Sequence, residues 1–546
     1  MKRIYHLMLA FAATLLLASS CADKPGVTRA VNPLTYTDIP DNDLIRVGDS
    51  YYMVSTTMYF CPVAPIMKSK DLVHWQIVNY VCDLIEDDDV YNLRNGRNAY
   101  GKGQWATSLR YVDGTYYALF IANDQPDKTY VYKTDDIENG KWTKTELEGK
   151  FHDASMLFDN DGRLYILWGN GDLHLTELEP DASAVKKDGI DSVIIESPRE
   201  GYSLRAEGVH FYHIDDYYYV LEIDWPSGGV RTETCWRSKN ILGPYESKVV
   251  LSGAFDGRKD GVAQGGIVQT QYGDWYAIMF QDHGAVGRIP TVQPVTWVDG
   301  WPMMGDNGTP VKEFDVNLTP WGEDYVWDSD EFDSGTLALV WQWNHKPVAD
   351  RWSLSERPGW MRLKTCNVVP GIALARNTLT QRTVGPCSSS SVKLDASGLK
   401  PGDRAGICAF QSNCATVGVE VAEDGSKALV VRENSNGMKR GMKDGKPYFE
   451  RYAEDKVICS EALESENVWL RIDYTFTPSS LDLSEPDTAT FSWSYDGENW
   501  KTSDYTLHMR YTLDYFTGYR TALYCYPTIA EGGYADFDWF RQQVTE

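Results

Sequence analysis

A single motif recurs five times in the first 280 or so residues: a polar turn, one or more aromatic residues, and then an apolar run. The copies read GDSYYMV, DGTYYALF, DGRLYILW, DDYYYVLE and YGDWYAIMF. Aligned on the aromatic residue before the apolar run, they make Tyr52, Tyr117, Tyr165, Tyr219 and Tyr276 equivalent. Their spacing of 48 to 65 residues is typical of propeller blades. Each turn between apolar stretches predicts a hairpin, so the sequence predicts a five-bladed β-propeller.

The residues that precede these hairpins indicate a shared site. Twelve positions before the aligned aromatic residue lie Trp105, Asp153, Glu207 and Gln264, and eleven positions before it lies Asp41. Asp and Glu make up 78 of 546 residues, so five random positions would hold fewer than one acid on average. Taken singly, each acid is most simply a solvated loop residue or a strand cap. Taken together, the three acids predict a common site at one end of the propeller channel.

Charge and composition narrow the class of ligand. The net charge of −26 argues against nucleic acid and anionic membrane as partners, because phosphate-binding surfaces need a basic patch. A neutral ligand is the simpler expectation. The 13% aromatic content is typical of packed β structure and also of sugar-stacking surfaces.

The first 21 residues predict an export signal. Lys2 and Arg3 form a positive start, an apolar run follows from Leu7 to Leu17, and small residues precede Cys21. The pattern resembles a bacterial lipoprotein signal, with an ordinary secretory signal as the alternative. We therefore expect an exported protein of a Gram-negative bacterium, either anchored in the outer membrane by a lipid on Cys21 or periplasmic. No later stretch is apolar enough for a transmembrane helix.

The remaining chain divides into segments of different pattern. A tether is expected over 22–32, the propeller over 33–305 and a connecting segment over 306–325. Residues 326–546 alternate polar and apolar positions between Gly, Asn, Asp and Pro turns, which predicts a β-sandwich of the jelly-roll or lectin kind. The short connection predicts that the sandwich packs against the propeller as a structural partner. One loop of the sandwich is expected to form part of the pocket wall.

Nine cysteines follow Cys21, and no CxxC or Cys/His spacing indicates zinc. Most are expected to be free and buried. Cys408 and Cys414 are the one plausible local pair.

The set of motifs resembles glycoside hydrolase family 43, five-bladed propellers that remove xylose or arabinose from plant polysaccharides. DNDLIRVGDSYYMVSTTM, WATSLRY, HDASMLFDNDGRLYILWG and AEGVHFY match the first four blades, and GRIPTVQPVTWVDGWP matches the region after the fifth. WQWNHKP, RWSLSERPGWMRL and LTQR look like the sandwich often fused to xylosidases and arabinofuranosidases of the family. The resemblance covers nearly all of the chain that follows the signal.

The resemblance implies roles for particular residues. Asp41 matches the general base, Asp153 the acid that tunes and orients its partner, and Glu207 the general acid of an inverting reaction. Arg288 matches an arginine that contacts sugar hydroxyls, with a surface ion pair as the alternative. Trp105 is expected either to stack against the sugar at the base of the site or to be a core residue. His283 is expected either to line the pocket or to be a loop histidine.

Two positions depart from the family pattern. Asn42 replaces the usual Pro after the base, which predicts a looser turn. Gln264 replaces a His that helps hold a central calcium ion or water in many members, so no cofactor is expected to be required and a structural calcium is doubtful.

The sequence thus predicts an exo-glycosidase that releases terminal β-D-xylose or α-L-arabinofuranose from xylan or arabinoxylan oligosaccharides. The alternative is a non-catalytic surface lipoprotein that only binds glycan. Retention of all three acids favours the enzyme. The choice between the two pentoses depends on pocket shape.

Overall fold

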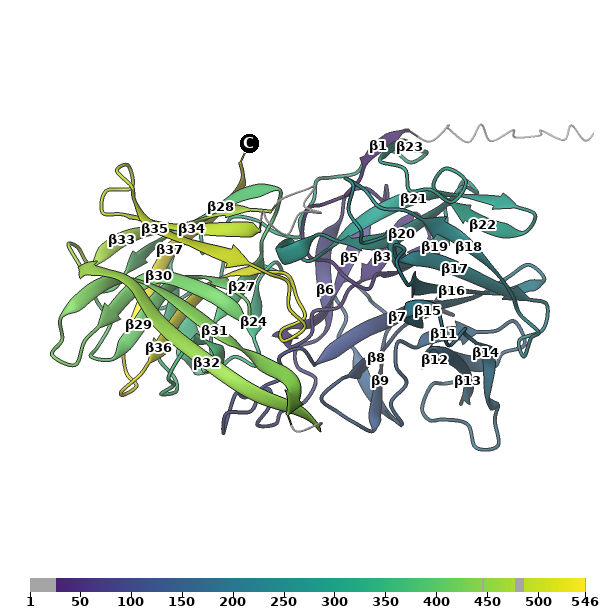
Figure 1. The fold of residues 1–546 in the computed structure, drawn as a ribbon, viewed down its shortest axis with the longest axis horizontal. Helices are drawn as coiled ribbons and strands as arrows, with labels where there is room; N and C mark the ends of the chain where they lie inside the picture. Colours follow the sequence, from purple (N-terminus) through teal and green to yellow (C-terminus); the bar gives the residue numbers. More distant parts are fainter. Residues whose placement is uncertain (1–25, 444–445, 477–485, 546) are drawn as a thin grey trace, which may run out of the picture.

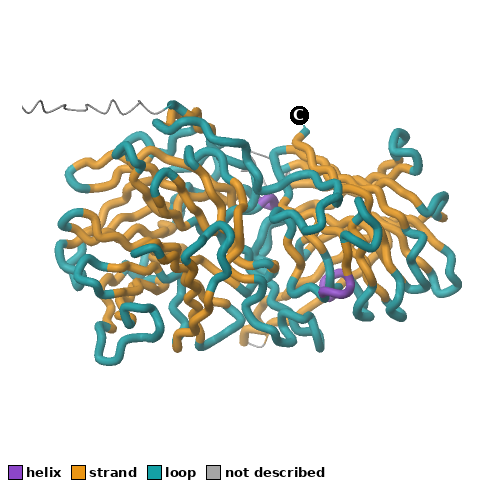
Figure 2. The backbone as a smooth tube through the Cα atoms, turned by 180° about the vertical axis from the view of Figure 1, so that it is seen from behind, coloured by secondary structure: helices purple, strands orange, loops and turns teal. Residues whose placement is uncertain are grey.

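The computed structural model describes residues 26–443, 446–476 and 486–545, which form two β-rich domains lying side by side (Figure 1). Strands account for most of the regular structure in both domains (Figure 2). In these ranges the helices are three short 3₁₀ turns, and none of them is long and apolar enough to cross a membrane. The predicted signal segment, residues 1–21, lies outside the described residues.

The N-terminal domain is a five-bladed propeller, as predicted. Each blade is a four-stranded antiparallel sheet. The blades comprise β2 (Asp43–Val47), β3 (Ser50–Val54), β5 (Val63–Ser69) and β6 (Gln76–Cys82); β7 (Gln104–Val112), β8 (Thr115–Ala122), β9 (Lys128–Thr134) and β10 (Thr143–Glu148); β11 (Ser155–Phe158), β12 (Leu164–Asn170), β13 (Asp172–Leu178) and β14 (Asp191–Glu196); β15 (Tyr202–Ile214), β16 (Tyr217–Pro226), β17 (Thr232–Ser238) and β18 (Glu246–Ser252); and β19 (Ala263–Gln269), β20 (Trp275–Asp282), β21 (Arg288–Val298) and β22 (Trp301–Met304).

The recurring sequence motif forms the turn and second strand of each blade. Its aligned aromatic residues lie in β3, β8, β12, β16 and β20, where all but the half-buried Tyr117 are buried. The first strands, β2, β7, β11, β15 and β19, contact one another in a closed ring. That ring brings equivalent positions of the five repeats together around one axis.

The two ends of the propeller sequence are joined by a separate ribbon. β1 (Thr28–Val31) pairs antiparallel with β23 (Glu313–Val316). Part of the segment expected as a tether and part of the segment expected as a connection are therefore paired strands.

The C-terminal domain is a sandwich of two antiparallel sheets, as predicted. One sheet has the order β32-β31-β30-β29-β36-β27-β24-β4 and the other β25-β26-β37-β28-β33-β34-β35. The strands are β4 (Phe60–Cys61), β24 (Gln342–Asn344), β25 (Trp352–Ser353), β26 (Met361–Lys364), β27 (Leu379–Arg382), β28 (Cys387–Asp395), β29 (Asp403–Phe410), β30 (Asn413–Val421), β31 (Lys427–Lys443), β32 (Lys446–Ala462), β33 (Asn467–Thr475), β34 (Asp487–Ser494), β35 (Lys501–Met509), β36 (Arg520–Pro527) and β37 (Tyr534–Val544).

The sandwich and the propeller share one sheet and one core. β4 comes from the first propeller blade, yet it pairs with β24 of the sandwich. A hydrophobic cluster contains side chains from both domains, and within it the rings of Tyr100 and Tyr515 stack at 3.8 Å. Buried Asp38 accepts hydrogen bonds from the backbone N–H groups of Arg288 and Gly518. These contacts support the expected partnership between the domains.

The structure contradicts the suggested Cys408–Cys414 pair, because both residues are buried free thiols. The register of β29 with β30 places Cys408 opposite Thr416, so Cys414 lies diagonally from Cys408. The two thiols interact with each other but are not bonded. All nine cysteines of the described residues are free.

Candidate active site

All five equivalent repeat positions line one pocket. Asp41 and Asp153 lie two residues before β2 and β11, and Trp105, Glu207 and Gln264 lie in β7, β15 and β19. The pocket is small, with a cavity volume of about 60 Å³. The other residues in its wall are Met58, Ala106, His152, Arg288 and Phe516. The prediction that the repeat brings these positions to one site is confirmed.

Unusual backbone geometry directs these side chains. Asp41, Asp153 and Gln264 have φ values of 54°, 48° and 61°, in the left-handed region that non-glycine residues rarely occupy. Such residues cost about 1 to 3 kcal/mol each and persist where the surrounding structure imposes them. The pairing register also shifts on either side of Glu207. Irregularities of this kind aim side chains away from the regular strand direction.

Asp41 is held by an arginine on the fifth blade. Arg288 Nη1 donates to Asp41 Oδ1 at 2.6 Å, and both side chains are 8% exposed. Arg288 Nε and Nη2 are also buried and have no hydrogen-bond partner among the described residues. Arg288 is therefore a buried pocket residue rather than a surface ion pair.

The turn that carries Asp41 is fixed despite the missing proline. Asn42 is fully buried, and its side chain donates to the carbonyl of Ile39 at 3.0 Å. Its own carbonyl lies 3.1 Å from His210 Nε2. These hydrogen bonds tie the turn to Ile39 and to the fourth blade at the position where the family pattern has a proline.

Asp153 and Glu207 form a coupled pair of acids. Asp153 is buried and accepts the backbone N–H of Gly208, whereas Glu207 is partly exposed and accepts a hydrogen bond from Asn170 Nδ2. Burial raises the pKa of Asp153, and the nearby Glu207 and Asp41 carboxylates raise it further, while His152 opposes them. A negative charge on Glu207 therefore favours the neutral form of Asp153.

Trp105 lies in the pocket wall between two other rings. It is half-buried, and its centroid lies 5.6 Å from His152 and 5.7 Å from Phe516. Phe516 belongs to the sandwich, so a sandwich segment does line the pocket as predicted.

His283 is not part of the pocket wall, contrary to expectation. It is 1% exposed, with Nδ1 3.1 Å from the Tyr36 hydroxyl and Nε2 3.2 Å from Gln281 Nε2. Burial lowers the pKa of His283 to about 2, so the ring is neutral. A 3₁₀ turn at Gly284–Val286 separates it from Arg288. His152, Asn170, Met58 and Phe516 are the site residues that sequence reasoning missed.

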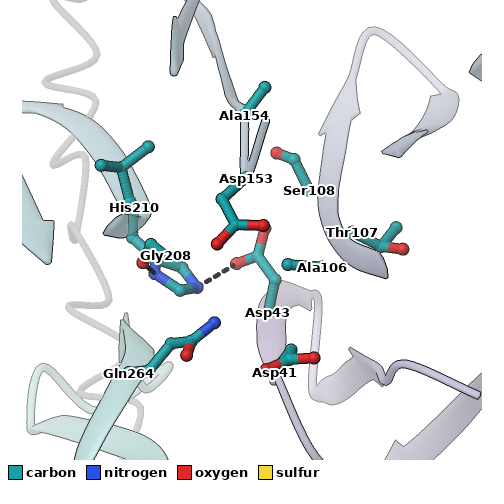
Figure 3. Close-up of a pocket in the computed structure, with 11 residues that line it drawn as sticks. Asp41, Asp43, Ala106, Thr107, Ser108, Asp153, Ala154, Gly208, His210 and Gln264 are labelled. Carbon is teal, nitrogen blue, oxygen red and sulfur yellow. Dashed lines mark hydrogen bonds and ion pairs between the residues drawn. The ribbon is translucent and has the colours of Figure 1, made fainter. Parts of the chain in front are cut away.

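The channel beneath the pocket does not fit a calcium ion. Figure 3 shows Asp41, Asp43, Asp153, Gln264 and His210 around a cavity of about 10 Å³, enough for about one water molecule. Both Asp43 oxygens accept protein hydrogen bonds, and the Arg110 guanidinium lies 2.7 Å from one of them. Calcium takes six to eight oxygen ligands, water molecules among them, and a cavity of this size has no room for an ion together with such waters.

One group of possible metal ligands occurs in the described residues: His152, Asp153 and Glu207, whose ligand atoms lie within 4.8 Å of one another.

Two stretches of the chain, one in each domain, match known protein-family models. Residues 30–302 match the model described as glycosyl hydrolases family 43, and residues 329–543 match the beta xylosidase C-terminal concanavalin A-like domain. The chain belongs to glycosyl hydrolases family 43. It is accordingly a glycoside hydrolase.

Relatives in this family are similar over long stretches. A beta-xylosidase of Formosa agariphila is 29% identical over 93% of this chain and 89% of its own. A non-reducing end alpha-L-arabinofuranosidase of Bacteroides ovatus is 32% identical over 61% of this chain and 64% of its own. A solved structure of a bifunctional GH43-CE protein of Bacteroides eggerthii is 41% identical with a TM-score of 0.85. Our chain covers 64% of that protein, and 96% of our chain is aligned.

Proposed function

We propose that the protein is an inverting, exo-acting glycosidase that releases terminal β-D-xylose or α-L-arabinofuranose from xylan and arabinoxylan oligosaccharides. The observation that carries the proposal is the single small pocket lined by Asp41, Asp153 and Glu207 and closed on one side by Phe516. A small pocket with Phe516 of the sandwich in its wall suits the end of a chain better than its middle, which favours exo action. The similarity to a beta-xylosidase over nearly the whole chain favours xylose as the released sugar. The similarity to an arabinofuranosidase is the reason to propose arabinose as the alternative.

In the proposed reaction, the Glu207 carboxyl group donates its proton to the glycosidic oxygen. The bond from that oxygen to the anomeric carbon breaks, and its electron pair stays on the departing oxygen. Asp41 accepts a proton from a water molecule, whose oxygen bonds to the anomeric carbon from the opposite face. Inverting enzymes place these two carboxyl groups about 6.5 to 9.5 Å apart to leave room for the water.

The other pocket residues bind the sugar and orient the Asp41 carboxylate. The free donors of Arg288 are suited to sugar hydroxyls, and the Trp105 face to the apolar face of a sugar ring. The Arg288 ion pair aims the Asp41 carboxylate. We propose that no metal ion is required. A role limited to binding would not need the strained backbone that turns two acids into the pocket.

We further propose that the enzyme is exported and acts on plant cell-wall fragments, anchored by a lipid on Cys21 or free in the periplasm. Metabolic labelling with a lipid precursor tests the anchor. Label on the wild type but not on Cys21→Ser is expected, and no label on the wild type would reject the anchor.

The reaction is tested by proton NMR during the first minutes of cleavage of a xylo-oligosaccharide. Inversion predicts that the α anomer of xylose appears first, before mutarotation. A β anomer as first product would overturn the role of Asp41. Release of neither pentose from aryl xyloside or aryl arabinofuranoside would overturn the proposed substrate class.

A further inference from the structure

His152 occupies an unusual place between two acids of the site. Its Nε2 lies 3.6 Å from Asp153 Oδ2 and 3.5 Å from Glu207 Oε2. That nitrogen is buried and makes no closer hydrogen bond within the described residues. The backbone holds the residue in place, because the His152 carbonyl accepts the N–H of Gly169 at 3.0 Å. Trp105 packs against the ring on one side.

The proposed reaction creates a need for a group in this place. Asp153 should be negative while Glu207 carries the proton, yet Asp153 is the more buried of the two and burial favours its neutral form. When Glu207 gives up its proton, the negative charge is on Glu207 as well. An N–H donor that can reach either carboxylate would stabilise both arrangements.

We propose that His152 is a positioning residue whose Nε2–H is shared between Asp153 and Glu207. The N–H donates to the Asp153 carboxylate while Glu207 is protonated, and shifts toward the Glu207 carboxylate as that residue protonates the leaving oxygen. His152 neither gains nor loses a proton in the reaction. This inference rests on the proposed function, because it assumes that Glu207 is the general acid.

The nearly equal distances are the main support for a shared donor. A donor dedicated to one acid would lie at about 2.7 to 2.9 Å from it, whereas Nε2 lies about midway between two. The charged groups that act on the ring are Asp153, Glu207 and Lys150. Burial lowers the pKa of His152, but the two acids outweigh burial and Lys150, so the pKa lies above its ordinary value. Nε2 carries hydrogen in the imidazolium form, and in the neutral form the acceptors favour that tautomer.

Two substitutions separate the effect of losing the His152 hydrogen-bond donor from the effect of losing its side-chain packing. His152→Gln places an amide N–H near the position of Nε2, whereas His152→Leu fills the space without a donor. His152→Leu removes the hydrogen bond that stabilises the Asp153 carboxylate, and a hydrogen bond to a charged group is strong. Asp153 should then ionise at a higher pH, so the acidic limb of the kcat/KM profile should move up by about one pH unit. His152→Gln should restore most of that shift. His174→Leu is the matched control, since His174 is a half-buried histidine stacked on Trp168 at 4.7 Å.

The leaving group provides a second readout. His152→Leu should lower kcat on xylobiose about tenfold more than on an aryl xyloside whose leaving group needs no protonation. An effect through folding alone would lower both equally at every pH. A His152→Leu profile that superimposes on the wild type, or a His152→Gln profile that matches Leu, would overturn the proposal.

A measurement without turnover distinguishes this proposal from the proposed function. ¹⁵N NMR of the His152 imidazole reports which nitrogen carries hydrogen. We expect hydrogen on Nε2, and a lower titration midpoint in both Asp153→Asn and Glu207→Gln. Hydrogen on Nδ1 alone at neutral pH would refute the shared donor even in an active enzyme. Failure of the wild type to release a pentose would instead refute the proposed function, with the NMR result unaffected.

Discussion

Phe516 offers the sharpest test of how the sandwich contributes to activity. Its ring lies 5.7 Å from Trp105 and 5.0 Å from the Arg288 guanidinium. An aromatic pair contributes about 0.5 to 1.5 kcal/mol and a cation–π contact about 0.5 to 2 kcal/mol. Because these contacts hold in place the two residues proposed to bind the sugar, Phe516→Ala should cost about 1 to 3 kcal/mol of transition-state stabilisation. That corresponds to a loss of about 5-fold to 150-fold in kcat/KM.

The assay compares Phe516→Ala with Phe516→Leu, which keeps bulk in the wall. Both are measured on xylobiose and on an aryl xyloside, and the products from xylohexaose are separated by chain length. Opening the wall should also let longer chains cross the pocket. Ala but not Leu should therefore give xylobiose, xylotriose and xylotetraose among the first products from xylohexaose, whereas exo cleavage gives xylose and xylopentaose. A Phe516→Ala enzyme with kcat/KM within twofold of the wild type and only xylose and xylopentaose as first products would refute this reasoning.

Three further predictions follow from the site and its surroundings. Glu207→Gln should abolish hydrolysis of natural oligosaccharides but retain much more activity on aryl glycosides with good leaving groups, since only the former need a proton; equal losses would remove the acid role. Glu222 is buried beside Asp224, and burial raises its pKa well above the ordinary value. An acid with a raised folded pKa contributes stability at low pH that is lost as pH rises through that pKa. Glu222→Gln keeps the acceptor for Trp236 Nε1 and should therefore raise Tm at pH 7 and leave it unchanged at pH 4; equal Tm values at pH 7 would contradict this. Dialysis against EDTA should leave kcat and Tm within error, and restoration of lost activity by calcium alone would contradict the assignment of no metal.

The repeat made the propeller and its acids predictable. Hairpins with a common period have a common register, so equivalent residues such as Asp41 and Asp153 must meet where the inner strands begin. The same reasoning could not place Phe516, because no periodic feature links a sandwich loop to the channel. The β4–β24 pairing was hidden for the same reason, since a two-residue strand leaves no pattern.

The histidines show where sequence proximity misleads. His283 precedes Arg288 by five residues, but the intervening 3₁₀ turn leaves it buried behind the pocket. His152 is adjacent to Asp153 and could have been proposed from that position alone. Its contact with Glu207, however, depends on the packing of the third blade against the fourth. Loop conformation and blade packing are set by tertiary contacts that period and composition do not encode.

The strand pairings between distant segments set an order in which the protein can be completed. β1 cannot pair until β23 exists, and β4 waits for β24, whose Gln342 side chain bonds to Pro62 across 280 positions of sequence. A chain that emerges from its N-terminus would leave β1 and β4 without partners until β23 and β24 have been made. Contacts of such long range slow folding and leave strand edges open to other chains. A chaperone that covers blade one should therefore raise the yield of this enzyme more than one that acts on the last strands.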